Sequence, residues 1–376
     1  MFVRYLAVTA MVAVLFLGGC SSLPKPSNAT TAPPPIPPAV DKPTLRVERL
    51  ATNPIITPQM LAGHDGENIG DPSLIRVPDW VSNPLGKYYL YFAHHHGQYI
   101  RMAYANHIEG PWKIFEPGAL KLEGTICDSA SNSKWAKKKH LASPDVIVDE
   151  KAREIRMYFH CPPYIAGTEE ETGNIKEFSY VARSKNGLDF KAQTEALGNW
   201  FFRVFHWAGS YYALAMPGVF YRSADGLSGF EKGPTLFSKN MRHSAVKVQG
   251  DTLQVFYSLV GDNPERILLS TIALSAQWQN WRETPARVIL EPEREWEGAT
   301  LPLKPSERGP AREPVRQLRD PAIFVDQGRT FLLYSVAGEQ GIGIAEIHTD
   351  NEKNKGGASA ASQSLPAPDR QRQPPG

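Results

Sequence analysis

The sequence predicts an all-β fold, a five-bladed β-propeller, and three observations lead to this prediction. An Asp-Pro pair followed by an apolar strand, a Gly-bearing turn and an aromatic return strand occurs over residues 71–92 and again over residues 320–334. Related hairpins recur between these two at intervals of tens of residues, which is typical of propeller blades. Aromatic residues make up 10% of the chain, which suits the packed interfaces between blades.

Five hairpins align on their turns. They cover residues 71–92, 143–160, 202–214, 243–257 and 320–334, and a third strand follows each, as at 100–105, 180–184 and 342–347. Residues 46–56 precede the first hairpin, and we expect them to supply the strand that closes the ring against the fifth blade. Where strands lack hydrophobic alternation, we expect both faces to be buried between blades. A β-sandwich also uses many short strands, but the repeated phrase favours a propeller.

The two ends of the chain predict processing and tethering. One positive charge at Arg4, an apolar run over 6–17 and Leu-Gly-Gly before Cys20 indicate a secretory signal over residues 1–19. The apolar run is too short to span a bilayer comfortably. Cys20 after this motif resembles a bacterial lipobox, in which that cysteine becomes the lipidated N-terminus; an ordinary signal peptide that contains a cysteine is the alternative.

Residues 20–45 are rich in Pro, Ser, Thr and Ala, which is typical of an extended tether. Residues 349–376 predict a disordered tail, and this leaves 46–348 as the propeller domain. A lipid anchor at Cys20 places the protein at the cell envelope. Ser-Ser after Cys20, with no Asp, favours the outer membrane by analogy with other lipoproteins.

Composition sets mild limits on partners. Lys and Arg number 41 and Asp and Glu number 39, so no basic bias points to nucleic acid. Cys127 and Cys161 remain in an oxidising compartment where a disulfide can persist, although their pairing cannot be deduced from sequence. They do not form a metal motif, since no second Cys or His lies at ligand spacing. The oligomeric state is open.

The direction of the strands gathers polar residues at one face of the predicted disc. Inner-strand starts and second-strand ends share a face, because the second strand returns along the first. The starts carry Asp71, Ser143, Asp145, Arg203, His243, Arg319 and Asp320, and the ends carry His94, His95, His96, His160, the loop 262–266 with Glu265, and Glu339. Clustered carboxylates push their pKa values apart, so that an acid and a carboxylate coexist near neutral pH. This suits acid/base hydrolysis of a glycosidic bond.

The chain resembles the five-bladed propeller glycoside hydrolases of families 43 and 117, with families 32 and 68 as more distant relatives. The resemblance covers residues 50–348 and rests on short motifs, which are Asn53-Pro54-Ile55-Ile56, Gly70-Asp71-Pro72-Ser73, Tyr88-Tyr89-Leu90-Tyr91, Ser143-Pro144-Asp145-Val146 and Arg319-Asp320-Pro321-Ala322. It implies Asp71 as general base and Asp145 as the residue that tunes the acid. The family 43 general acid is a Glu on blade three, and here that blade opens with Phe202-Arg203-Val204. Glu265 and His243 are the candidate replacements.

The sequence therefore predicts a lipid-anchored glycoside hydrolase that acts by inversion, with carbohydrate as substrate and no cofactor or catalytic metal. The expected substrate-binding residues are His94, His95, His96, His160, Arg203, Trp207, Arg319 and Asp320. The resemblance allows a structural Ca²⁺ near the axis. Two alternatives stay open: a family-130-like phosphorylase that holds phosphate with Arg203 and His243, and a non-catalytic glycan-binding propeller. Asp71 and Asp320 could equally be structural, capping backbone N–H groups at strand starts.

Overall fold

The computed structural model describes residues 45–130, 139–162 and 177–349. The predicted signal, Cys20, the tether and the tail beyond Thr349 lie outside the described residues. In the described part of the chain the helices are short 3-10 turns, and none has the length and apolarity of a transmembrane segment.

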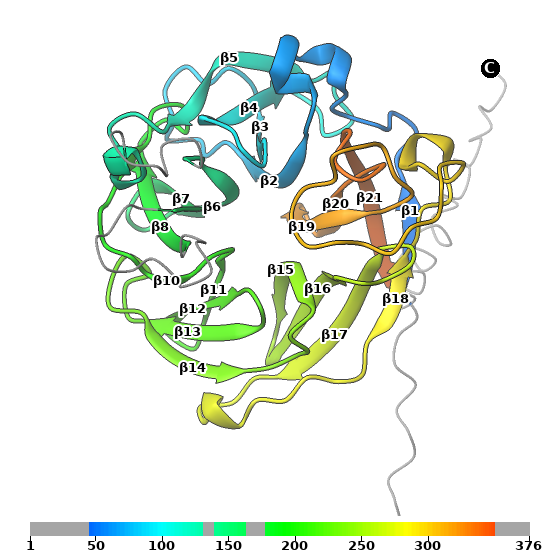
Figure 1. Cartoon of the computed structure of the whole chain (residues 1–376). Helices are drawn as coiled ribbons and strands as arrows, with labels where there is room; N and C mark the ends of the chain where they lie inside the picture. Colours follow the sequence, from blue (N-terminus) through cyan, green and yellow to red (C-terminus); the bar gives the residue numbers. More distant parts are fainter. Residues whose placement is uncertain (1–44, 131–138, 163–176, 350–376) are drawn as a thin grey trace, which may run out of the picture. The chain divides into compact units, whose positions relative to one another are not determined.

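Five antiparallel sheets surround a common centre, and Figure 1 shows their inner strands β2, β6, β11, β15 and β19 facing it. The first four blades follow chain order. Blade I holds β2 (Gly70–Arg76), β3 (Tyr88–Ala93), β4 (Tyr99–Ala105) and β5 (Lys113–Lys121), and blade II holds β6 (Ala142–Asp149), β7 (Glu154–Cys161), β8 (Phe178–Ser184), β9 (Lys191–Ala192) and β10 (Gly198–Asn199). Blade III holds β11 (Arg203–Trp207), β12 (Ser210–Ala215), β13 (Val219–Ser223) and β14 (Glu231–Thr235), and blade IV holds β15 (Met241–Gln249), β16 (Thr252–Leu259), β17 (Ile267–Ala273) and β18 (Arg287–Leu290).

Blade V closes the ring with both ends of the propeller. It holds β19 (Arg319–Asp326), β20 (Arg329–Ser335), β21 (Ile342–Thr349) and, at its outer edge, β1 (Leu45–Arg49). β1 pairs antiparallel with β21 from Leu45 opposite Thr349 to Arg49 opposite Ala345. This confirms the predicted five-bladed propeller and the predicted closing strand.

Short 3-10 helices lie in the connections. They are η1 (Pro58–Met60), η2 (Gly63–Gly66), η3 (Ile126–Ala130), η5 (Trp278–Asn280) and η6 (Glu295–Glu297). A disulfide joins Cys127 of η3 to Cys161 at the end of β7, which settles the pairing that the sequence left open.

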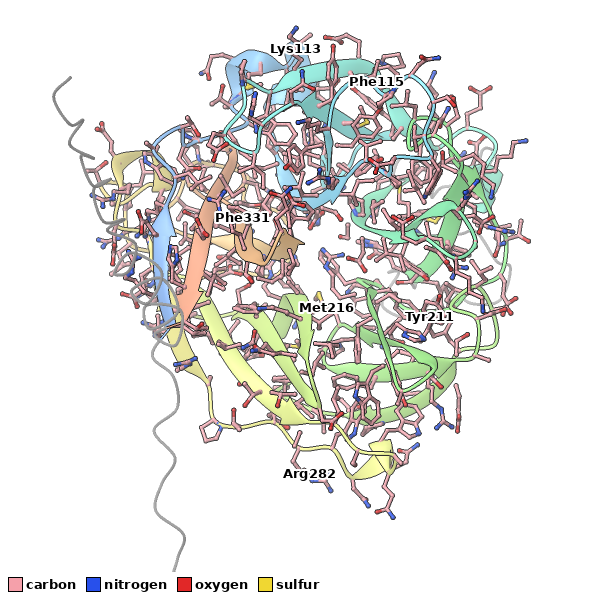
Figure 2. The ribbon with its side chains drawn as sticks, turned by 180° about the vertical axis from the view of Figure 1, so that it is seen from behind. Lys113, Phe115, Tyr211, Met216, Arg282 and Phe331 are labelled. Carbon is pink, nitrogen blue, oxygen red and sulfur yellow. A yellow bond between two sulfur atoms is a disulfide. The ribbon has the colours of Figure 1, made fainter. Side chains whose placement is uncertain are left out.

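The core is divided among the gaps between blades, and one apolar cluster fills each of the five gaps. Strand β3 shows how a single strand serves two gaps. Tyr89 and Tyr91 pack toward blade II, while Leu90 and Phe92 pack toward blade V. Figure 2 shows side chains filling the space between the ribbons. Burial on both faces explains why such strands lack the polar alternation of a one-sided sheet.

Candidate functional site

Three inner strands begin with the same unusual backbone. Asp71, Ser143 and Asp320 have φ of 56°, 55° and 48°, and a proline follows each of them. The strand pairing shifts register directly after these residues. A left-handed residue at a register shift re-aims its side chain and costs conformational energy, and such strain is concentrated at functional sites. The positive φ at these three positions therefore directs their side chains differently from those of a regular strand.

The re-aimed carboxylates connect neighbouring blades. The main-chain N–H of Asp71 donates to Oδ2 of Asp320 at 3.3 Å, and that of Ser143 donates to Oδ2 of Asp71 at 3.2 Å. The side chain of Asp145 accepts from the main-chain N–H of Val204 at 2.7 Å. All three predicted aspartates thus accept a hydrogen bond from the start of the inner strand of the next blade, as the structural alternative anticipated.

His243 adds an imidazole to the two axial carboxyls. Its Nδ1 forms an ion pair with Oδ1 of Asp320, and its ring stacks on Phe201 with centroids 4.5 Å apart. One ligand atom from each of Asp71, His243 and Asp320 lies within 4.8 Å of the other two. All three side chains are buried. The sequence prediction that these residues meet at the axis is therefore correct in placement.

Electrostatics separates the two carboxyls. Burial, followed by the negative charge of Asp320, raises the pKa of Asp71 well above its usual value, although Arg203 opposes the shift. Burial also works against ionisation of Asp320, but His243 and the hydroxyl of Ser335 outweigh it and hold the pKa of this carboxyl well below its usual range. The two pKa values are therefore displaced in opposite directions, and Asp71 is the carboxyl of the pair that is more readily protonated.

Two buried arginines, Arg203 and Arg319, bind groups of the neighbouring strands and loops. Nε of Arg203 donates to the carbonyl of Ser244 at 2.8 Å, and its Nη1 approaches the carbonyls of Ser143 and Pro144. Arg319 pairs with Glu339 at 2.9 Å and with Glu265 at 3.1 Å. Both arginines are more than 95% buried. Arg203 binds main-chain carbonyls and Arg319 binds two carboxylates of the protein. A direct role of either arginine in substrate binding stays a prediction.

Glu265, a predicted general acid, has no exposed surface. Besides its pairing with Arg319, it accepts a hydrogen bond from the hydroxyl of Ser258 at 2.6 Å. A proton donor must reach the glycosidic oxygen, and this side chain does not reach solvent. Its surroundings therefore suit a structural carboxylate better than the predicted acid.

The three consecutive histidines after β3 differ in burial and surroundings. His94, His95 and His96 lie in the turn after β3, not on the strand as expected. His95 is near enough to His140 and His243 for their charges to lower its pKa, after the larger effect of burial. Burial lowers the pKa of His94 to about 4, and His96 is exposed.

Trp207 does not belong to this group. It ends β11, whereas Arg203 begins it, and its indole N–H donates to Asp251 at 3.0 Å. Because a strand rises about 3.3 Å per residue, the tryptophan lies at the opposite end of the blade from the axial carboxyls. Trp207 therefore does not join the axial group, and its role in substrate binding stays a prediction.

Two further side chains join His160, and the sequence prediction did not include them. His140 precedes β6 and Glu177 precedes β8, and both imidazoles have Nε2 3.5 Å from the Glu177 carboxylate. Burial raises the pKa of Glu177 to about 7. Neither His140 nor Glu177 belongs to a recurring sequence motif. The only signal in the sequence was their position just before the strands β6 and β8.

A cavity of about 670 Å³ opens beside this site. Its lining includes Lys304, Arg308, Arg312 and the buried Arg319. The positive charge of Arg312 contributes to lowering the pKa of His96, after burial and His140. The volume is within the range of small-molecule sites. Arg319, which precedes Asp320 in the sequence, lines the cavity, whereas Asp71, His243 and Asp320 do not.

The protein is a five-bladed β-propeller with two aspartates and a histidine gathered near its centre. No family model matches the chain. The chain is 35% identical over 333 residues to uncharacterized protein R118 of Acanthamoeba polyphaga mimivirus, and the match covers 82% of this chain and 92% of that protein. The chain belongs to the family of this viral protein.

Solved propeller structures are similar at lower identity. A GH43 β-xylosidase/α-arabinofuranosidase from a compost microbial metagenome, in complex with xylotriose, is 13% identical with a TM-score of 0.49, over 82% of this chain and 95% of that one. The α-L-arabinanase of Cellvibrio cellulosa, complexed with arabinohexaose, is 11% identical with a TM-score of 0.46, over 77% and 97%. A GH32 β-fructofuranosidase of Bombyx mori is 11% identical with a TM-score of 0.49, over 82% and 62%.

Proposed function

We propose that the protein is a glycoside hydrolase that cleaves an oligosaccharide or polysaccharide at the cell envelope, where Cys20 anchors it through lipid. The observation that carries this proposal is the axial pair of Asp71 and Asp320, whose pKa values are displaced in opposite directions. Most glycoside hydrolases use one carboxylic acid and one carboxylate at the same site.

The electrostatics supports a different division of roles from the one that the resemblance implies. Asp71 was expected to be the base, but its raised pKa favours the protonated form and so suits it better to donate a proton. Asp320 with His243 supplies the ionised partner. The facing oxygen atoms of Asp71 and Asp320 lie within 4.8 Å, which is shorter than the roughly 6.5–9.5 Å between the carboxyls of inverting enzymes. If this pair reacts directly, the spacing favours retention over the predicted inversion.

Two other functions have support from specific observations. A non-catalytic glycan-binding propeller is favoured by the hydrogen bonds that Asp71, Asp145 and Asp320 accept from backbone N–H groups, since these give each aspartate a structural reason to exist. A phosphorylase is supported by Nη2 of Arg203, which is buried and has no hydrogen-bond partner among the described residues. A phosphorylase would require phosphate and release a sugar phosphate.

The test is a screen of the purified full chain against plant and algal oligosaccharides and aryl glycosides, alongside Asp71→Asn. We expect turnover that Asp71→Asn lowers about 10²–10⁴-fold, the usual contribution of a proton-transfer group. Asp251→Asn is the matched control, because Asp251 is an exposed aspartate that binds Trp207 far from the axis. Unfolding curves establish that the variants are folded.

Saturable glycan binding without turnover, unchanged in Asp71→Asn, would overturn the hydrolase proposal and leave the binding propeller. Turnover that depends on added phosphate would favour the phosphorylase. NMR of the first-formed anomer of the sugar decides between retention and inversion.

A further inference from the structure

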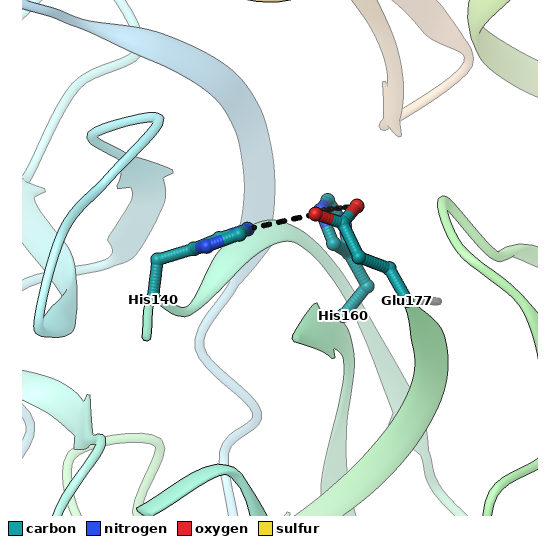
Figure 3. A group of neighbouring side chains, drawn as sticks. All are labelled: His140, His160 and Glu177. Carbon is teal, nitrogen blue, oxygen red and sulfur yellow. Dashed lines mark ion pairs between the residues drawn. The ribbon is translucent and has the colours of Figure 1, made fainter. Parts of the chain in front are cut away.

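Three ligand-type side chains converge at one end of blade II, and the ring of Phe201 lies between His160 and the axial His243. His140 precedes β6, His160 lies in β7, and Glu177 directly precedes β8. The ladder brings them together, because Ala142 pairs with His160 and Cys161 pairs with Phe178. Figure 3 shows both imidazoles directed at the carboxylate of Glu177.

The spacing of the three groups is that of ligands around an ion. Nε2 of His140 lies 3.5 Å from Oε1 of Glu177, and Nε2 of His160 lies 3.5 Å from Oε2. These separations exceed a normal N–H···O hydrogen bond of about 2.7–3.2 Å. Two ligands at about 2.0–2.1 Å from a tetrahedral metal lie roughly 3.4 Å apart. One ligand atom from each of the three residues lies within 4.8 Å of the other two.

The donor set matches a known metal chemistry. Two imidazoles and one carboxylate hold zinc in catalytic sites that keep a fourth position for water or substrate. His140 and His160 are both buried, so the site is largely shielded from solvent. The carboxylate of Glu177 lies 3.5 Å from each of the two imidazoles.

The segments that carry both histidines are fixed to the same short helix. Cys161, which follows His160, is disulfide-bonded to Cys127 of η3. Lys139, which precedes His140, pairs through Nζ with Oδ1 of Asp128 in η3 at 2.7 Å. These two links hold the imidazoles in place before any ligand arrives, and such preorganisation is what a metal site requires.

We infer that His140, His160 and Glu177 form a binding site for one divalent transition-metal ion of the zinc type, with a fourth position open to water or substrate. The sequence predicted no catalytic metal, and it showed no second Cys or His at ligand spacing from Cys127 or Cys161. The site is distinct from the group of Asp71, His243 and Asp320, with which it shares no residue.

The test measures zinc binding by the full chain, after chelator treatment and dialysis, using titration calorimetry and elemental analysis. We expect about one equivalent of zinc in the parent protein. Glu177→Gln, which preserves shape, and His160→Asn should each weaken binding at least 10-fold. Cobalt(II) should give visible absorption bands of a tetrahedral site that both variants lose.

Two control variants make the result specific. His206→Asn alters an exposed histidine of β11, and His243→Asn alters the axial imidazole. Both should retain zinc if the inference is correct. The inference is overturned if the parent binds no zinc, if Glu177→Gln and His160→Asn bind it unchanged, or if only His243→Asn loses it. Because the readout is binding and not turnover, failure of this site and failure of the hydrolase proposal are separate results.

Discussion

Individual side chains at the starts of the inner strands form hydrogen bonds to the main chain of the next blade. Ser73 and Asp145 hold the same place after the register shift in blades I and II. The hydroxyl of Ser73 accepts from the N–H of Val146 at 2.9 Å, as the carboxylate of Asp145 accepts from that of Val204. Asp145 therefore has a structural role in addition to the tuning role that the resemblance implies, and substitutions can separate the two.

Asp145→Ala should lower the free energy of unfolding by about 1–3 kcal/mol, because it leaves the buried N–H of Val204 without an acceptor. Asp145→Asn retains an oxygen and should cost less. If Asp145 also tunes a proton donor, Asp145→Asn should lower kcat while stability is kept. Urea unfolding and rate measurements distinguish the two effects. Ser73→Ala, which removes the equivalent hydrogen bond between blades I and II, is the matched comparison. An Asp145→Ala variant as stable as the parent would contradict the structural role.

At the scale of single elements, the first residue of β7 anchors blade II at its hairpin. Glu154 binds Arg183 through Nε at 3.0 Å, and Lys185 lies 3.4 Å away. The hydrogen bonds from Arg183 lower the pKa of Glu154, and burial opposes the shift only in part. A carboxyl whose folded pKa is depressed contributes stability above its unfolded pKa, about 4.3, and loses it as pH falls through the folded value.

Glu154→Gln should therefore destabilise the protein at pH 6 by up to about 1 kcal/mol, the scale of partly exposed pairs. The difference from the parent should shrink toward zero as the pH falls below about 4. Urea unfolding at a series of pH values measures this difference, with the exposed Glu123→Gln as control. A difference that grows on acidification would show that the pKa shift has the opposite sign.

At the scale of the described propeller, stability depends on ring closure by β1. Arg49, the last residue of this strand, pairs with the fully buried Glu297 at 2.7 Å, and the hydroxyl of Tyr334 donates to the same carboxylate at 2.9 Å. Arg49 also donates to the carbonyl of Glu291 at 2.8 Å. The closing strand is thus locked to the connection before β19 by a buried charge as well as by its ladder.

Arg49→Ala should cost about 3–5 kcal/mol, because it leaves the buried carboxylate of Glu297 unpaired. Arg46→Ala is the matched control on the same strand, where the pair with Glu48 is more than half exposed on both sides. An exposed pair contributes about 0–1 kcal/mol. Thermal and urea unfolding measure both variants. Equal effects would mean that the ladder alone closes the ring.

The sequence by itself determined the blades. The Asp-Pro openings, the Gly-bearing turns and the aromatic return strands are local features, and each specifies its own hairpin, so the five hairpins and the closing strand could be predicted. The same periodicity placed Asp71, His243 and Asp320 at the axis. Trp207 was misplaced because it ends the inner strand of its blade, whereas the axial residues lie at the starts of theirs.

Only the tertiary structure decided what those residues do. The opposite pKa displacements of Asp71 and Asp320 arise from burial and from charges on other blades. The burial of Glu265 and the meeting of His140, His160 and Glu177 likewise depend on strands whose separation in sequence fixes neither distance nor exposure. Local patterns specify secondary structure, whereas protonation and ligand geometry are set by the packing of distant segments.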